Sequence, residues 1–168
     1  AIFDVVAAAF GSPRAVFIAL LVTAAILWAA ERFGRPQRGL DGVGGVDAIA
    51  VGAAQALALL PGISRSGSTI SAGLLRGLQR PDAARLSFLM SIPVMVGAGL
   101  VGLKDLADLS PRMDMLLPIA VGFVAAAIVG YLTIRWLLGY LAEHRLTVFA
   151  AYCFVLGIVG LFVTWING

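Results

Sequence analysis

Four long apolar stretches dominate this sequence of 168 residues, at 16–30, 86–103, 115–138 and 146–166. Each approaches the roughly 20 residues that a helix needs to cross a lipid bilayer. The composition agrees, because 61% of the residues are hydrophobic and only 12% are charged, against roughly 25% charged residues in a typical soluble domain. We therefore expect an all-α, polytopic membrane helical bundle in which residues 1–168 form a single membrane domain.

Local signals indicate where the first of these helices begins and where the second bends. Ser12 followed by Pro13 is typical of an N-cap and a first helical residue, so the first helix should run from Pro13 to roughly Phe33. Pro93 lies inside the second apolar stretch, where it should kink the helix.

A fifth apolar segment, residues 48–60, is too short to cross the membrane. Its residues would cover only about 20 Å as a helix, against a hydrocarbon core of roughly 30 Å. Pro61 and Gly62 end it, and a second short stretch follows at about 70–78. Two short helices joined by a polar loop predict a re-entrant hairpin at about residues 47–78, which must be shielded by protein or water.

The distribution of basic residues supports a hairpin that returns to its own side. With a re-entrant hairpin, eight arginines share one face: Arg32, Arg35, Arg38, Arg76, Arg80, Arg85, Arg135 and Arg145. Only Arg14, Lys104 and Arg112 lie on the other face. If the hairpin crossed the membrane instead, the same basic residues would be divided five against six between the two faces, and neither face would be favoured. Because basic residues favour the cytoplasmic side, the hairpin should enter from the cytoplasm.

The loop of the hairpin, residues 61–69, combines glycines, hydroxyl groups and one guanidinium. Gly62 and Gly67 permit a close approach of the backbone, and Arg65 offers a planar charged fork that matches phosphate oxygens. The N-terminus of the following helix also favours an anion. Further hydroxyl donors are supplied by Ser64, Ser66, Ser68 and Thr69. These features predict a phosphate site within reach of a lipid headgroup.

A purely structural interpretation of the same loop stays open at this point. The loop would then be a helix-packing turn, with Arg65 paired to a carboxylate or to carbonyl groups and the serines acting as caps. Nucleotide binding is not indicated, because the sequence has no Walker-type Gly-Lys-Ser/Thr motif, and we expect no nucleic-acid partner.

Residues 61–71, PGISRSGSTIS, closely resemble the second signature of the undecaprenyl-diphosphate phosphatase family, of the bacitracin-resistance type. The flanking segments QALALL (55–60) and ARLSFLMSIP (84–93) resemble it too. The resemblance covers nearly the whole sequence but only the second half of a family member. It implies one half of an inverted-repeat architecture, in which each repeat carries a re-entrant hairpin.

The resemblance also implies an activity: release of the terminal phosphate from undecaprenyl diphosphate, which recycles the lipid carrier of cell-wall synthesis. The protein would be a multi-pass protein of the bacterial plasma (inner) membrane. Arg65 and Ser64 would be catalytic, with Arg65 stabilising charge on the transferred phosphoryl group. The substrate-binding residues would be Gly62, Ser66, Gly67 and Thr69.

The resemblance further implies a divalent cation, Mg²⁺ or Ca²⁺. Such ions prefer carboxylate oxygens, but the only glutamates are Glu31 and Glu143, at predicted loops, and the only histidine is His144. We therefore expect no metal ligand in this segment and assign the ligands and the nucleophile to the first repeat, which this sequence lacks. Ser64 as nucleophile is the open alternative.

Two other functional classes remain compatible with the sequence. The re-entrant hairpin also suits a transporter or flippase of a phosphorylated polyprenyl lipid. Because the first repeat is missing, the segment alone could also be catalytically silent. A homodimer is an open expectation for its partners.

Overall fold

The computed structural model describes residues 12–108 and 113–166. The described part is almost entirely helical, which confirms the predicted all-α class. Its elements are α2 (Pro13–Phe33), the 3₁₀ turn η1 (Leu40–Gly42), α3 (Gly45–Leu57), α4 (Arg65–Leu75), α5 (Arg80–Asp108), α6 (Met113–Glu143) and α7 (Thr147–Ile166).

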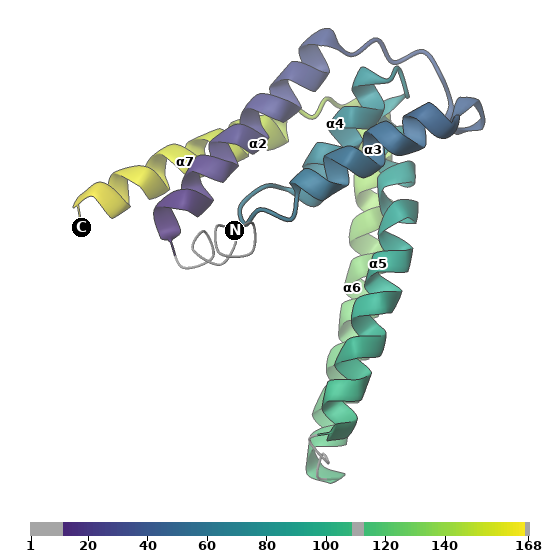
Figure 1. The fold of residues 1–168 in the computed structure, drawn as a ribbon, viewed down its shortest axis with the longest axis vertical. Helices are drawn as coiled ribbons and strands as arrows, with labels where there is room; N and C mark the ends of the chain where they lie inside the picture. Colours follow the sequence, from purple (N-terminus) through teal and green to yellow (C-terminus); the bar gives the residue numbers. More distant parts are fainter. Residues whose placement is uncertain (1–11, 109–112, 167–168) are drawn as a thin grey trace.

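Four helices are long and apolar enough to cross a membrane, and they coincide with the four predicted stretches. These helices are α2, α5, α6 and α7. Figure 1 shows them as two pairs, α2 beside α7 and α5 beside α6, which diverge from the hairpin formed by α3 and α4. Most apolar side chains of α5 and α6 are exposed, as expected of helices whose surroundings are lipid or further protein.

The predicted start and end of the first helix are confirmed. Ser12 is the N-cap, its Oγ accepting a hydrogen bond from the Ala15 N–H at 3.4 Å, and Pro13 is the first helical residue. The helix ends at Phe33. Pro93 lies inside the single helix α5, and the kink expected there stays a prediction.

The hairpin consists of two short helices, but their boundaries differ from the expected ones. Helix α3 ends at Leu57, before Pro61, and α4 begins at Arg65 rather than near residue 70. The reason is local: the Ser64 side chain caps the helix by accepting a hydrogen bond from the Gly67 N–H at 3.0 Å. Most of the motif thus forms the first turns of α4 instead of a loop.

Helix α4 lies at the centre of the fold and packs against α2, α3 and α5. Its contact with α5 is close, because a Cβ added at Gly73 would lie 2.9 Å from the Cβ of Ala83. The core around it consists of small and branched side chains, among them Ala24, Leu27, Ala30, Ile70, Leu74, Leu78, Ala83 and Ala84. The motif at the start of α4 is therefore supported on three sides.

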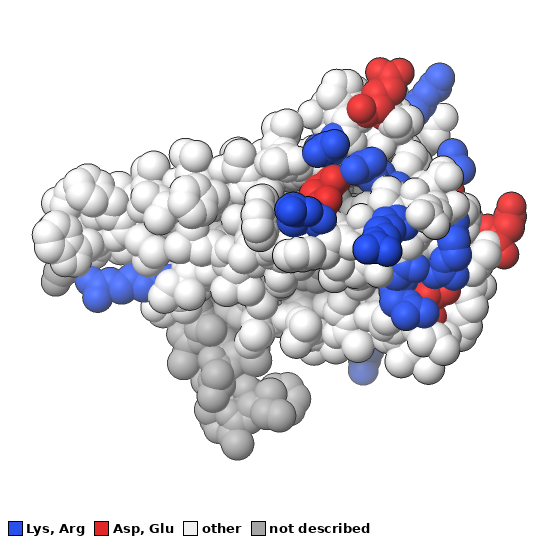
Figure 2. Space-filling view, turned by 90° about the horizontal axis from the view of Figure 1, so that it is seen from above, with Lys and Arg blue, Asp and Glu red and all other residues white. Residues whose placement is uncertain are grey.

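On the face of the molecule seen in Figure 2, most of the charged side chains gather at one end. This distribution agrees with the predicted basic face, although Arg112 lies outside the described residues. Two carboxylates at this end are buried in ion pairs. Asp47 contacts Arg38 at 3.1 Å and Arg76 at 2.7 Å.

Glu31 forms the second buried pair and corrects an expectation. It lies within α2 rather than in a loop, and both carboxylate oxygens accept hydrogen bonds from Arg80, at 2.8 and 2.7 Å. Its Oε1 also accepts the Leu146 N–H at 2.8 Å. One carboxylate thus joins α2, the start of α5 and the turn before α7.

Candidate functional site at the hairpin tip

The turn between α3 and α4 lies directly against α2. Gly62 adopts a left-handed conformation, with φ +88°, which glycine reaches without strain. A Cβ at this position would lie 2.6 Å from the carbonyl oxygen of Val16 and 2.7 Å from the Cβ of Ala19. Both the backbone conformation and the space therefore require glycine, and the turn cannot move away from α2 without losing this contact.

Ser64 occupies the point where the turn becomes helix. Its Oγ is the N-cap acceptor for Gly67, and its own N–H donates to Oγ1 of Thr23 at 3.1 Å. The hydroxyl proton of Ser64 is not needed for capping, so it remains able to donate to a ligand. Gly67 is helical, and its missing side chain leaves room for Ser64, because an added Cβ would lie 3.0 Å from the Ser64 Oγ.

Thr69 faces the protein interior, unlike Ser64. Its side chain is 1% exposed, and its Oγ1 lies 2.6 Å from Oγ of Ser87 on α5. The same oxygen is 2.9 Å from the carbonyl oxygen of Arg65. This hydroxyl links α4 to α5, so its expected role in holding phosphate stays a prediction. Ser68 is also buried, and its Oγ has no hydrogen-bond partner among the described residues.

Arg65 is the first residue of α4 and is half-buried. Within residues 12–108 and 113–166, no hydrogen bond or ion pair engages its guanidinium. Four other arginines, which do not lie at the hairpin tip, contact carboxylates, namely Arg38, Arg76, Arg80 and Arg85. The alternative in which Arg65 is neutralised by a carboxylate or carbonyl of this chain is therefore not observed in the described part.

An apolar cavity of about 240 Å³ opens beside the motif. Ser64, Ser66 and Gly67 line one wall, so the fold brings three of the expected site residues together. Arg65, Thr69 and Gly62 do not line it. The other walls are apolar or aromatic and come from Leu27, Ile70, Leu137, Leu141, Leu146, Phe149, Tyr152 and Cys153. The cavity thus has hydroxyl groups on one side and apolar walls, suited to a hydrocarbon chain, on the others.

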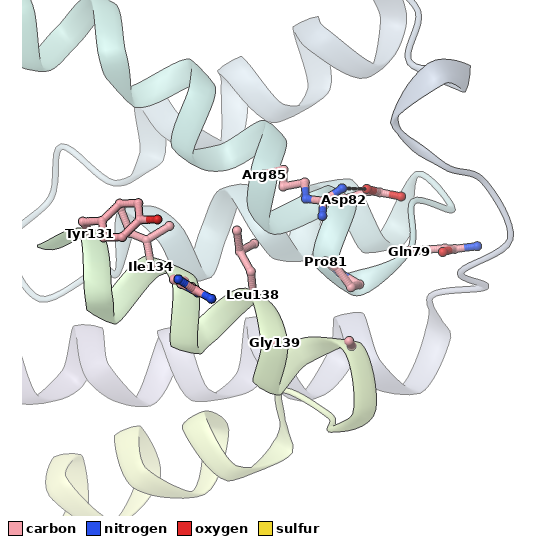
Figure 3. Close-up of a pocket in the computed structure, with 10 residues that line it drawn as sticks. Gln79, Pro81, Asp82, Arg85, Tyr131, Ile134, Leu138 and Gly139 are labelled. Atoms are coloured by element: carbon pink, nitrogen blue, oxygen red, sulfur yellow. Dashed lines mark hydrogen bonds and ion pairs between the residues drawn. The ribbon is translucent and has the colours of Figure 1, made fainter.

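A larger cavity of about 750 Å³ lies between the start of α5 and the end of α6. Figure 3 shows Arg85 and Asp82 of α5, joined by an ion pair of 3.5 Å, across from Tyr131 and Ile134 of α6. None of the expected site residues lines this cavity. Although this cavity is larger, the motif residues do not contact it, so we do not assign the phosphate site to it.

The described residues do not form a ligand set for a divalent cation. They contain no group of three or more His, Cys, Asp or Glu side chains able to hold a metal ion. Asp47, at the base of the hairpin, is occupied by two arginines and by the Gly44 N–H. The hydrogen bond from Arg38, together with those from Gly44 and Arg76, holds the pKa of this carboxyl well below its usual range. Asp47 is thus committed to an ion-pair network.

Two residues that support the site, Thr23 and Ser87, were not predicted from the sequence. Thr23 is the single hydroxyl residue within the apolar stretch 16–30. A lone hydroxyl in an apolar helix was the one sequence signal that could have pointed to it. A lone threonine in an apolar helix commonly bonds to its own backbone, so its contact with a turn 41 residues away could not be read from spacing.

This fold and motif define a class of multi-pass membrane proteins with a short, hydroxyl-rich hairpin. The family model for "Bacitracin resistance protein BacA" matches residues 1–159, and the chain belongs to that family. A protein of Synechococcus sp. (strain WH7803), named undecaprenyl-diphosphatase, is 49% identical over 148 residues, which cover 88% of this chain and 51% of that protein.

Further relatives carry the same name. The protein of Moorella thermoacetica is 43% identical over 158 residues, covering 94% of this chain and 59% of its own length. The protein of Methanothermobacter thermautotrophicus is 46% identical over 154 residues, covering 89% of this chain and 83% of its own length. The chain thus spans about half of the length of the Synechococcus protein and about three fifths of the length of the Moorella protein.

Proposed function

We propose that this chain forms the phosphate-binding half of a membrane hydrolase that converts undecaprenyl diphosphate to undecaprenyl phosphate and inorganic phosphate. The enzyme would act in the bacterial inner membrane and recycle the lipid carrier of cell-wall synthesis. The observation that carries the proposal is the guanidinium of Arg65 at the start of α4, which no hydrogen bond or ion pair engages among the described residues. Arg65 lies in the same stretch of chain as Ser64, Ser66 and Gly67, which line the apolar cavity.

The start of α4 offers several donors for one anion. The first N–H groups of a helix have no partner within it, and here Ser64 Oγ satisfies only that of Gly67. The helix dipole and the guanidinium of Arg65 add positive charge at the same end. These groups suit a phosphoryl group whose oxygens carry the developing charge during transfer.

In the overall reaction one water is consumed: its oxygen becomes bonded to the terminal phosphorus, the bond from that phosphorus to the bridging oxygen breaks, and the lipid monophosphate leaves with the bridging oxygen. Arg65 and Ser64 would donate hydrogen bonds to the phosphoryl oxygens. No histidine or carboxylate of the described residues contacts the Ser64 hydroxyl, so this part of the chain offers it no general base. We therefore assign the attacking group, and the ligands of Mg²⁺ or Ca²⁺, to residues outside the described part, as expected if they belong to the first repeat of the family architecture.

The apolar cavity supports a lipid substrate over a soluble diphosphate. Two hydroxyl residues of the motif, Ser64 and Ser66, line one side of the cavity, and mainly leucine and aromatic side chains line the rest. Burial of hydrocarbon contributes about 0.8 kcal/mol per CH₂ group, so an isoprenyl chain entering here would add affinity that a soluble diphosphate lacks.

Phosphate release by the full-length parent protein tests this function. With farnesyl diphosphate we expect one inorganic phosphate and one farnesyl phosphate per turnover, with Mg²⁺ or Ca²⁺ present and not after chelation. Inorganic pyrophosphate should be a poor substrate because it lacks the chain. Release of pyrophosphate, or binding of the lipid without hydrolysis, would contradict the proposal, and the second result would favour the flippase alternative.

A further inference from the structure

One hydroxyl group of the membrane-spanning helix α2 contacts the backbone of the motif turn. Thr23 is 1% exposed, and its Oγ1 accepts a hydrogen bond from the Ser64 N–H at 3.1 Å. The same hydroxyl donates to the carbonyl oxygen of Gly62 at 3.5 Å. A single side chain thus holds the backbone on both sides of Ile63.

The methyl group of Thr23 makes a separate contact in the same place. A Cβ added at Gly67 would lie 3.4 Å from Cγ2 of Thr23, so the methyl group packs against the first turn of α4. The side chain therefore acts in two ways, by hydrogen bonds to the turn and by packing against the helix. Substitutions can separate these two contributions.

The position of this contact relates it to the proposed phosphate site. Ser64 is the N-cap of α4, and Arg65 follows it directly. Fixing the Ser64 backbone fixes the direction in which α4 starts, and with it the free N–H groups and the Cα of Arg65. Small displacements of groups that position a substrate, about 1 Å, can lower a rate about 10²-fold.

We propose that Thr23 is a positioning residue for phosphoryl transfer, whose hydroxyl holds the start of α4 in place from α2. The inference rests on the proposed function, because it assumes that the start of α4 binds the transferred phosphoryl group. Thr23 itself does not touch the cavity. Its effect passes through the backbone of Ser64.

Three variants of the full-length protein test this role. Thr23→Val keeps the shape and removes the hydroxyl, Thr23→Ser keeps the hydroxyl and removes the methyl group, and Thr23→Ala removes both. The matched control is Thr164→Val in α7, because the Thr164 hydroxyl donates to the Leu161 carbonyl of its own helix, at 3.0 Å, and to no other group among the described residues.

Kinetics on farnesyl diphosphate should separate positioning from packing. We expect Thr23→Val to lower kcat about 10-fold or more with KM changed less than about threefold, Thr23→Ser to retain most of kcat, and Thr164→Val to match the wild type. Wild-type kcat in Thr23→Val would overturn the proposal. If Thr23→Val does not fold, a Thr23→Ser kcat as low as that of Thr23→Ala would overturn it equally.

Hydrogen exchange tests the contact independently of turnover. The Ser64 amide should exchange slowly in the wild type and in Thr164→Val, and faster in Thr23→Val. If the wild type hydrolyses no diphosphate but the Ser64 amide still exchanges faster in Thr23→Val, the proposed function is refuted while the contact between Thr23 and Ser64 is confirmed. Unchanged exchange in Thr23→Val would overturn the inference about Thr23.

Discussion

The hydroxyl groups of the motif serve two different purposes, although they lie within six residues of one another. Ser64 and Ser66 line the apolar cavity, whereas Thr69 is buried against Ser87. Side chains at adjacent helical positions point in different directions, so a continuous run of Ser and Thr cannot all face one ligand. The motif therefore combines ligand-facing and fold-supporting hydroxyls.

The Thr69–Ser87 contact should contribute measurably to stability. Replacing Ser87 by Ala removes a hydrogen-bond partner from a buried hydroxyl, and we expect the free energy of unfolding to fall by about 1 kcal/mol. Thermal unfolding in detergent measures this change. Ser91→Ala is the matched control on the same helix, because the Ser91 hydroxyl bonds to the Phe88 carbonyl within α5. Equal melting temperatures for the two variants would contradict the assignment.

At the scale of elements, Asp47 joins three segments at the base of the hairpin. It accepts hydrogen bonds from Arg38 in the loop after α2, from Arg76 at the end of α4, and from Gly44 at the start of its own helix. The low pKa of Asp47 means that its ionised form is favoured by the folded state.

The contribution of Asp47 to stability should therefore depend on pH. It is fully present above the ordinary aspartate pKa of about 3.9 and is lost as the pH falls toward the lower pKa of the folded state. Asp47→Asn should lower the melting temperature at neutral pH, and its difference from the wild type should narrow below about pH 4. Exposed Asp41→Asn is the control. A difference that stays constant down to acidic pH would contradict the ion-pair account.

The elements that could be predicted from the sequence are those whose signals are local. Long apolar stretches identified the four spanning helices, and Ser12 with Pro13 identified the start of α2. The start of α4 was misplaced because Ser and Gly are weak helix formers, which made residues 65–69 resemble a loop. The Ser64 cap and the packing of α4 on three other helices outweigh that weak propensity.

At the scale of the whole molecule, the contacts that the sequence did not predict are those between distant segments. Thr23 with Ser64, Asp47 with Arg76, and Glu31 with Leu146 each join parts of the chain that no spacing rule relates. The site was predictable as a motif, because its residues are contiguous. Its support was not, since that depends on how the helices pack.

The most direct test of the account is the turnover of farnesyl diphosphate by the full-length protein with Arg65→Ala. If the Arg65 guanidinium stabilises the transferred phosphoryl group, kcat should fall about 10²-fold or more while the melting temperature stays near that of the wild type. Arg32→Ala, which removes an exposed arginine at the end of α2, should leave kcat unchanged. A turnover of Arg65→Ala equal to that of Arg32→Ala would contradict the assignment of the phosphate site to the start of α4.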